Sequence, residues 1–226
     1  MDLGEQVYRL KEQLAAEGRR GLIAFDIDDT LSHTSRAFYQ KLDGLFPSPS
    51  HVTFEATRKH YALTGKVLYW GDILEAKEHA YSLVDSSEFH SEMDAIEEAI
   101  PIMQKIHERN LLGCYHTARL ETMQSMTRDW LDDRSFPQSP LITRPKHVSH
   151  SLQAQWKAEV IIYLFPEVAF LVDNDTRIAR QLENNRYQGR VLIIGLNERD
   201  YTPTEVTTPV ETFVDLGKIF DTFPEQ

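Results

Sequence analysis

The stretch Leu22-Ile23-Ala24-Phe25-Asp26-Ile27-Asp28-Asp29-Thr30-Leu31 turns abruptly from an apolar run into acidic residues and a hydroxyl. An apolar run that follows Gly21 and ends in acid predicts a strand buried on both faces of a parallel sheet. Ligands of open α/β sheets bind outside the carboxyl ends of the strands, so we expect these acidic residues at a binding edge. Clustered carboxylates are tolerated there when a cation neutralises them or when catalysis needs shifted pKa values. A turn that caps the next helix is the alternative interpretation.

Length and composition indicate a globular protein. The chain has 226 residues, which is enough for one sizeable core or for one domain with an insertion. Its hydrophobic share of 41% and charged share of 26% exclude a disordered chain. The formal net charge of −11 argues against a nucleic-acid partner, because such binding relies on Lys and Arg side chains that neutralise phosphates. A small phosphorylated ligand that meets local positive groups is compatible with this charge.

Targeting and redox features predict a cytoplasmic protein. No window approaches the roughly 18 apolar residues of a membrane span, and the N-terminus lacks the basic region and apolar core of a signal peptide. The only cysteine, Cys114, excludes an intramolecular disulfide and fits a reducing compartment. We therefore expect no membrane contact, and these patterns predict no particular oligomeric state.

Apolar runs and helical periodicity alternate along most of the chain. Beyond the first strand, at residues 22–27, four more are predicted at 111–116, 141–143, 168–172 and 191–194. Helices are predicted at 2–18, 89–109, 120–133, 152–164, 177–185 and 211–222, with Pro101 marking a kink or a restart in the second of them. The fold class is therefore α/β: a Rossmann-like parallel sheet of about five strands with right-handed crossovers, sandwiched by helices.

Residues 33–89 break this alternation. Aromatic residues are frequent in them, no strand-like run is visible, and helices are predicted at 34–45, 51–63 and 72–84. We interpret the segment as a helical insertion, so that residues 1–32 and 90–226 together form the α/β core domain.

Polar residues follow the predicted strands at the edge where a ligand is expected. They are Asp26 and Asp28 at the end of the first strand, Thr117 and Arg119 after the second, Asp173 and Asp175 after the fourth, and Lys157 in the helix before the fourth. Ordinary structural roles are the alternative, since Thr and Asp often cap helices and most lysines are solvated. The order of these residues in one α/β chain favours a shared site.

This order resembles the haloacid dehalogenase (HAD) superfamily of aspartate-based phosphatases. The family pattern is Asp-x-Asp-x-Thr after the first strand, Thr or Ser after the second, Lys in a later helix and an acidic pair after the fourth strand. Asp26-Ile27-Asp28-Asp29-Thr30 matches the first element in full, and the resemblance spans residues 22–195. It implies a Mg²⁺-dependent hydrolase of phosphomonoesters that acts on a small phosphorylated metabolite or nucleotide through an aspartyl-phosphate, with residues 33–89 as a helical cap.

The resemblance also implies roles for single residues. Asp26 is the nucleophile, and Asp28 is the general acid and then the general base. Mg²⁺ is held by the side chains of Asp26 and Asp173 and by the backbone carbonyl of Asp28. Thr117 and Lys157 bind the transferring phosphoryl group and take part in catalysis.

Two points of the resemblance stay open. Asn174 stands where many family members have a second acid, so either Asp175 acts on the metal through water or Asn174 supplies a neutral oxygen. Arg119 is expected to bind a second anionic group of the substrate, with a plain surface arginine as the alternative. His116 is expected to pack locally or to form hydrogen bonds.

Two other functions remain compatible with the sequence. A polynucleotide-end phosphatase shares this scaffold, although the acidic charge argues against it. A catalytically weak HAD-like protein that binds or regulates is the second alternative, motivated by Asn174.

Overall fold

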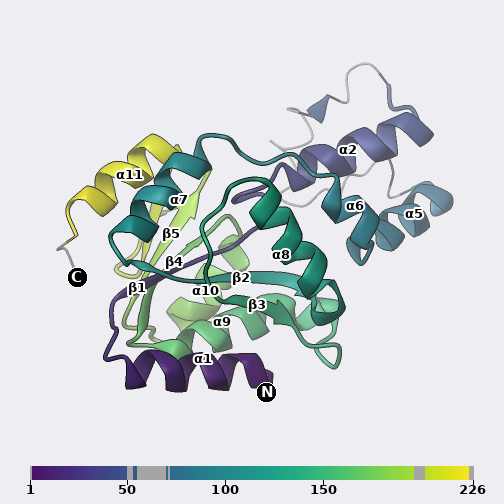
Figure 1. Ribbon diagram of the computed structural model, residues 1–226. Coiled ribbons are helices and arrows are strands. Elements are labelled where there is room, and N and C mark those ends of the chain that lie inside the picture. Colours follow the sequence, from purple (N-terminus) through teal and green to yellow (C-terminus); the bar gives the residue numbers. More distant parts are fainter. Residues whose placement is uncertain (1, 50–52, 55–69, 71, 196–201, 224–226) are drawn as a thin grey trace. The chain divides into compact units, whose positions relative to one another are not determined.

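The computed structural model describes residues 2–49, 53–54, 70, 72–195 and 202–223. The chain folds into two compact units (Figure 1). One unit consists of Met1–Leu31 and Ile96–Gln226, and the other, Ser32–Ala95, interrupts it in sequence. Within the described ranges, no helix is long and apolar enough to cross a membrane.

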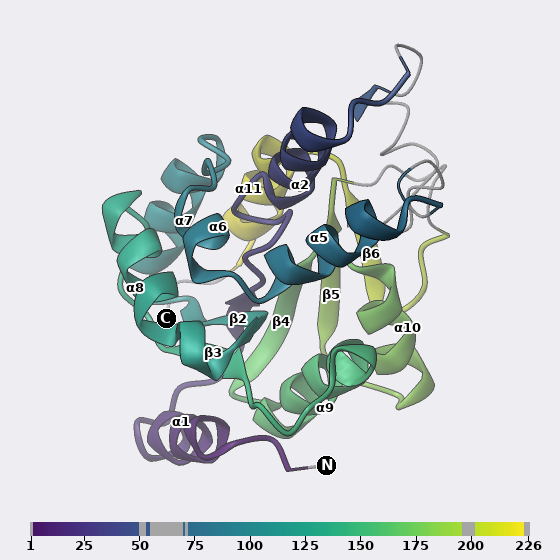
Figure 2. The same cartoon turned by 90° about the vertical axis from the view of Figure 1, so that its right-hand side faces the viewer.

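The larger unit is built around a six-stranded sheet in the order β3-β2-β1-β4-β5-β6 (Figures 1 and 2). The strands are β1 (Leu22–Phe25), β2 (Leu112–Leu120), β3 (Leu141–Arg144), β4 (Val168–Asp173), β5 (Arg190–Ile194) and β6 (Thr207–Val210). Every neighbouring pair is parallel. Phe25 of β1 is in register with Tyr115 of β2 on one side and with Val172 of β4 on the other. The predicted α/β class is thereby confirmed.

Helices cover both faces of the sheet, which is why β1 is apolar throughout. One layer contains α1 (Glu5–Ala16), α9 (Gln153–Leu164) and α10 (Thr176–Asn184), and the other contains α7 (Ala99–Glu108), α8 (Gln124–Asp133) and α11 (Phe213–Asp221) (Figures 1 and 2). Short 3₁₀ turns, η2 (Glu121–Met123) and η3 (His150–Leu152), precede α8 and α9. Side chains of β1 alternate between the layers: Leu22 and Ala24 join the core cluster that includes Trp156 of α9, whereas the Phe25 ring lies 6.3 Å from that of Phe220 in α11.

The sheet has six strands rather than the five predicted. The additional strand, β6, pairs with β5 at an edge of the sheet and contains Pro209. A proline lacks the N–H that an interior strand donates, so this short segment gives no strand signal although an edge position tolerates it. β2 is also longer than predicted and continues to Leu120, so that Thr117 and Arg119 belong to the strand instead of following it.

The single helix predicted at 89–109 is replaced by two helices. α6 (Ser87–Ser91) belongs to the smaller unit, and α7 begins only at Ala99 in the larger one. Pro101 lies in the first turn of α7, where its missing N–H has no intrahelical partner to lose. The proline therefore marks a restart and not a kink.

The smaller unit contains α2 (Thr34–Leu45), α5 (Leu74–Val84) and α6. Its described apolar side chains form two small clusters, one around Leu42 and Trp70 and the other around Phe89 and Met93. Ser32 and Ala95, the ends of the unit, form an antiparallel bridge. The helices predicted at 34–45 and 72–84 are confirmed, whereas the one predicted at 51–63 lies outside the described residues except for 53–54.

Gly113 allows β2 to lie close to β1. A Cβ atom on this residue would be 2.9 Å from Cβ of Leu22 and 3.3 Å from the backbone oxygen of Ile23. We expect Gly113→Ala to lower the free energy of unfolding by about 1–3 kcal/mol, as measured by urea denaturation. Gly44→Ala is the control, because no described atom lies within 4 Å of its added Cβ in α2, and it should be neutral or stabilise by up to about 1 kcal/mol. An unchanged free energy of unfolding for Gly113→Ala would contradict the close approach of the strands.

Candidate active site

Three neighbouring strands bring the predicted site residues together at the carboxyl edge of the sheet. Asp26 directly follows β1, and its backbone N–H donates to the carbonyl of Val172 in β4 at 2.9 Å. Thr117 lies in β2 on the other side of β1, and Asp173 is the last residue of β4. The strand order therefore determines which side chains meet.

Lys157 joins two of these carboxylates. Its Nζ atom lies 2.5 Å from Oδ1 of Asp26 and 2.6 Å from Oδ2 of Asp173. The three side chains are at most 5% exposed, so both ion pairs are shielded from water and salt. Lys157 lies in the first half of α9, which packs across β2 and β4 and so places the ammonium above the edge.

Burial shifts the pKa of every member of this cluster. It raises the pKa of Asp26 well above the ordinary value; Lys157 opposes the rise, and the charges of Asp173 and Asp28 add to it. Burial likewise raises the pKa of Asp173 against the pull of Lys157. For Lys157, burial acts to lower the pKa, but the two carboxylates outweigh it and the pKa is raised, so the ammonium stays charged. One positive charge between two carboxylates leaves excess negative charge, which favours a proton or a metal cation.

The second oxygen of each carboxylate is also held. Thr30 donates from Oγ1 to Oδ2 of Asp26 at 3.2 Å, and the backbone N–H of Asp175 donates to Oδ1 of Asp173 at 2.8 Å. Asp29 has a φ of 59° in the loop after β1, a left-handed conformation that Asp adopts more readily than most residues. This turn brings Thr30 back to Asp26.

Asp28 has a different partner from Asp26, although one residue separates them. Arg119 contacts the Asp28 carboxylate side-on, with Nη2 2.8 Å from Oδ1 and Nε 3.2 Å from each oxygen. Thr117 donates from Oγ1 to Oδ2 of Asp28 at 3.2 Å. Arg119 is buried, which corrects the interpretation of it as a plain surface arginine.

Asp175, one of the two residues considered for the metal beside Asp173, is the N-cap of α10. Its two oxygens accept hydrogen bonds of 2.6–3.0 Å from the guanidinium of Arg177. In the part of the chain that the structure describes, no group of three or more His, Cys, Asp and Glu side chains is arranged to hold a metal ion. The predicted ligand set has only two side chains, Asp26 and Asp173, besides a carbonyl; these oxygen donors and their excess charge fit Mg²⁺.

Two further buried residues shape the site. The strand predicted at 141–143 continues to Arg144, whose Nε donates to the carbonyl of Ala118 at 2.9 Å. His116 is fully buried against Trp156, with ring centroids 5.1 Å apart, which agrees with the expected local packing. Burial, with a smaller contribution from Lys157, holds the pKa of His116 well below its ordinary value, so the ring is neutral.

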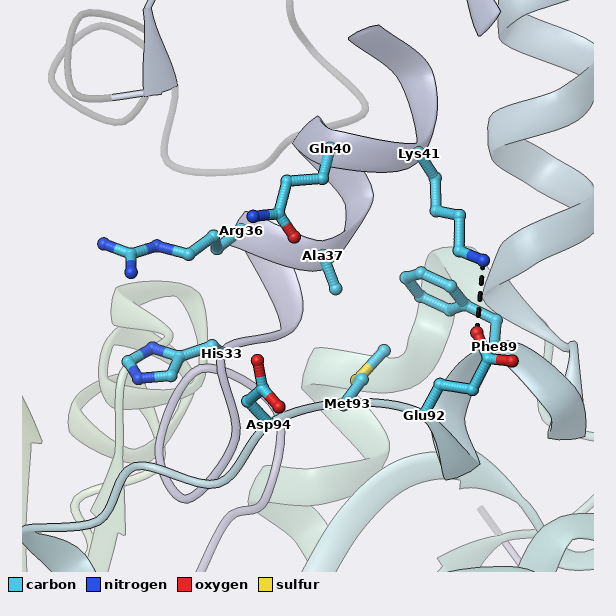
Figure 3. A pocket seen from close by; sticks show the side chains of 9 residues that line it. All are labelled: His33, Arg36, Ala37, Gln40, Lys41, Phe89, Glu92, Met93 and Asp94. Atoms are coloured by element: carbon cyan, nitrogen blue, oxygen red, sulfur yellow. Dashed lines mark hydrogen bonds and ion pairs between the residues drawn. The ribbon is translucent and has the colours of Figure 1, made fainter. Parts of the chain in front are cut away.

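The smaller unit carries a hollow of about 260 Å³ between α2 and residues 89–94 (Figure 3). Its lining combines apolar side chains with charged and polar ones: Ala37, Phe89, Met93, His33, Arg36, Gln40, Lys41, Glu92 and Asp94. Lys41 and Glu92 form an ion pair of 3.1 Å at one side of it.

Similarity to known proteins is found in three-dimensional structure and not in sequence. No protein-family model matches the chain, and no curated protein matches it in sequence. Among solved structures, protein tyrosine kinase A of Mycobacterium tuberculosis is similar with a TM-score of 0.59 and 16% identity, over 89% of this chain and 98% of that one. A HAD-superfamily hydrolase of subfamily IA, variant 1, from Geobacter sulfurreducens is similar with a TM-score of 0.53 and 16% identity, over 88% of this chain and 96% of that one.

A haloacid dehalogenase-like family hydrolase from Streptococcus pneumoniae matches in the same way, with a TM-score of 0.52 and 14% identity over 89% of this chain and 98% of that one. Similarity at these identities establishes the fold. The chain has the α/β fold of the HAD-superfamily hydrolases, as its resemblance to them predicted, with a second unit inserted between β1 and β2.

Lys157→Met leaves the carboxylates of Asp26 and Asp173 buried without their shared cation. We expect the free energy of unfolding at pH 7 to fall by about 3–5 kcal/mol, the cost of breaking a buried ion pair from one side. Adding Asp26→Asn removes one of the two negative charges and should recover part of this loss. Urea denaturation measures both variants, and a loss below about 1 kcal/mol, the range of exposed pairs, would contradict a buried cluster.

Proposed function

We propose that this protein is a HAD-type hydrolase of phosphomonoesters that requires Mg²⁺ and forms an aspartyl-phosphate on Asp26. The observation that carries the proposal is the buried cluster in which Lys157 bridges Asp26 and Asp173 at the carboxyl edge of the sheet. The fold supports a HAD-type scaffold, but such folds host different reactions, and one similar structure belongs to a protein named a tyrosine kinase. The choice of reaction therefore rests on the site.

Asp26 has the surroundings of a carboxylate nucleophile. In the first step, an Asp26 oxygen bonds to phosphorus while the ester P–O bond breaks, and the leaving oxygen takes a proton from the protonated carboxyl group of Asp28. In the second step, water attacks phosphorus, the bond between Asp26 and the phosphoryl group breaks, and Asp28 accepts a proton from the water. The alcohol and inorganic phosphate are the products, and the enzyme returns to its starting state. Lys157 stabilises the ionised form that Asp26 needs, against the effect of burial.

The excess negative charge of the cluster supports the requirement for Mg²⁺. The side chains of Asp26 and Asp173 and the carbonyl of Asp28 would hold the ion, which supplies the positive charge that lets a phosphate dianion approach carboxylates. Thr117 and Lys157 would contact the transferring phosphoryl group, one by a hydrogen bond and the other by charge.

The substrate is proposed to be a small phosphorylated metabolite or a nucleotide. The net charge of −11 supports this choice, because a polynucleotide would be repelled. A polynucleotide-end phosphatase would instead bind DNA or RNA tightly, with a steep dependence on salt.

We also propose that Ser32–Ala95 acts as the cap that selects the leaving group. It interrupts the larger unit between β1 and β2, is helical in much of its described part, and carries the hollow lined by Arg36 and Gln40. Substrate-dependent changes in KM for Arg36→Ala, without a change in kcat, are the expected sign of this role.

Hydrolysis of p-nitrophenyl phosphate with Mg²⁺ tests the nucleophile. Asp26→Asn should lower kcat by at least about 10³-fold, because an amide does not form the phosphoryl intermediate. Asp29→Asn is the matched control: it makes the same chemical change in the same loop, and Asn also tolerates the φ of 59° at this position. Equal rates for wild type and Asp26→Asn would sink the assignment. A wild type that hydrolyses nothing in a broad panel of phosphoesters would favour the binding or regulatory alternative.

Thermal unfolding tests the metal without relying on activity. Mg²⁺ at about 100 times its Kd should raise the free energy of unfolding by about 2.7 kcal/mol, because it binds only the folded protein. Asp173→Asn should remove most of this gain, since it deletes one of the two proposed carboxylate ligands. Asp175→Asn should keep the gain, because the Asp175 carboxylate pairs with Arg177. An equal gain for wild type and Asp173→Asn would place the ion elsewhere.

A further inference from the structure

We propose that Arg119 is a positioning residue that holds the Asp28 carboxylate for proton transfer, and that it is not a receptor for an anionic group of the substrate. This inference rests on the proposed phosphatase reaction and extends it to a residue that sequence alone assigned to substrate binding. The two roles differ in what the guanidinium touches, and the contacts of the described residues distinguish them.

Arg119 contacts Asp28 in the geometry best suited to fixing a carboxylate. Nη2 lies 2.8 Å from Oδ1, and Nε lies 3.2 Å from both Oδ1 and Oδ2. Thr117, two residues earlier in β2 and therefore on the same side of the strand, donates from Oγ1 to Oδ2 at 3.2 Å. The strand thus holds both oxygens of Asp28, and a side-on pair with a planar guanidinium fixes the orientation of the carboxylate plane.

The exposure of the two partners assigns their roles. The Arg119 side chain is 1% exposed, whereas the Asp28 side chain is 25% exposed. A substrate that enters from solvent therefore meets the carboxylate and not the guanidinium. An anionic group of the substrate would have to displace Asp28 from Arg119 and leave that carboxylate without its partner, which is unfavourable for a partly buried charge.

The surroundings of Arg119 hold it in place. Its Cζ atom lies 5.5 Å from the centroid of the Trp130 ring in α8, and that ring stacks on Phe136. The backbone N–H of Arg119 donates to Oγ1 of Thr117 at 3.2 Å, and Arg144 donates to the carbonyl of Ala118 between them at 2.9 Å. A guanidinium fixed by packing and by its own strand suits a supporting role for Asp28.

A positioning role for Arg119 can be detected in the reaction rates, because leaving groups differ in how much they need a proton from Asp28. An alkoxide is a poor leaving group, so cleavage of an alkyl phosphate depends on the proton that Asp28 delivers as the P–O bond breaks. The p-nitrophenolate ion leaves without a proton, so its release depends little on Asp28. Loss of Arg119 should therefore slow the first reaction much more than the second.

The experiment compares glycerol 2-phosphate with p-nitrophenyl phosphate for wild type, Arg119→Met, Asp28→Asn and the double variant. We expect Arg119→Met to lower kcat by about 10²-fold or more on glycerol 2-phosphate and by less than about 10-fold on p-nitrophenyl phosphate, with KM nearly unchanged. The double variant should be no slower than Asp28→Asn alone, because both changes remove one function. Arg119→Lys should recover little activity, since an ammonium cannot make the side-on pair.

Arg134→Met is the matched control. The Cζ atom of Arg134 lies 4.8 Å from the centroid of the same Trp130 ring, so this variant removes a guanidinium from that ring without removing the pair between Arg119 and Asp28. Its ratio of rates on the two substrates should equal that of the wild type. Circular dichroism and thermal unfolding confirm that each variant is folded.

The inference would be overturned by the following results. The first is a rise in the KM of Arg119→Met that is equal for both substrates, with kcat unchanged. The second is additive losses in the double variant. The third is an affinity of Arg119→Met for tungstate, a phosphate mimic, that is more than about 10-fold weaker than that of the wild type. Calorimetry measures this affinity without turnover. A wild type without Asp26-dependent turnover would overturn the proposed function and this role together, whereas an active wild type matched by Arg119→Met would overturn only the role.

Discussion

The ammonium of Lys157 between the carboxylates of Asp26 and Asp173 is the interaction on which the site depends. It joins the end of β1, the end of β4 and the first half of α9 through two ion pairs that water does not reach. Removing the ammonium alone, or the carboxylates alone, would leave a buried charge without an opposite charge beside it. The cluster is nevertheless unbalanced, because burial raises the pKa of both carboxyl groups and one lysine opposes two acids. The cluster therefore carries excess negative charge.

A second ion pair separates the acidic residues that follow β1 into two surroundings. Asp26 turns toward Lys157, whereas Asp28 turns toward Arg119 in β2. The proposed reaction needs two carboxylates with different tasks, one that bonds to phosphorus and one that moves a proton. The sheet supplies this difference, since β4 and α9 flank Asp26 and β2 flanks Asp28. Thr117 donates a hydrogen bond to Asp28, so the proposed proton donor is linked to the strand that is proposed to hold the phosphoryl group.

The fold and the site carry different parts of the functional conclusion. Similar solved structures share about a seventh of their residues with this chain, and they include HAD-superfamily hydrolases as well as a protein named a tyrosine kinase. The shared architecture places a binding edge at the carboxyl ends of the strands. Which reaction occurs at such an edge depends on its side chains, because one fold hosts different reactions.

The sequence by itself determined the α/β class, the buried central strand and the residues that meet at its edge, because apolar runs, helical periodicity and strand-end acids are local patterns. It missed β6, whose Pro209 hides an edge strand, and it ended β2 before Thr117. Only the tertiary structure decided the partners of the charged residues. Asp28 and Arg119 are 91 positions apart in the chain, and Lys157 is 131 positions from Asp26. Such pairings follow from strand order and helix packing, which bring distant segments within hydrogen-bonding distance and which no local pattern encodes.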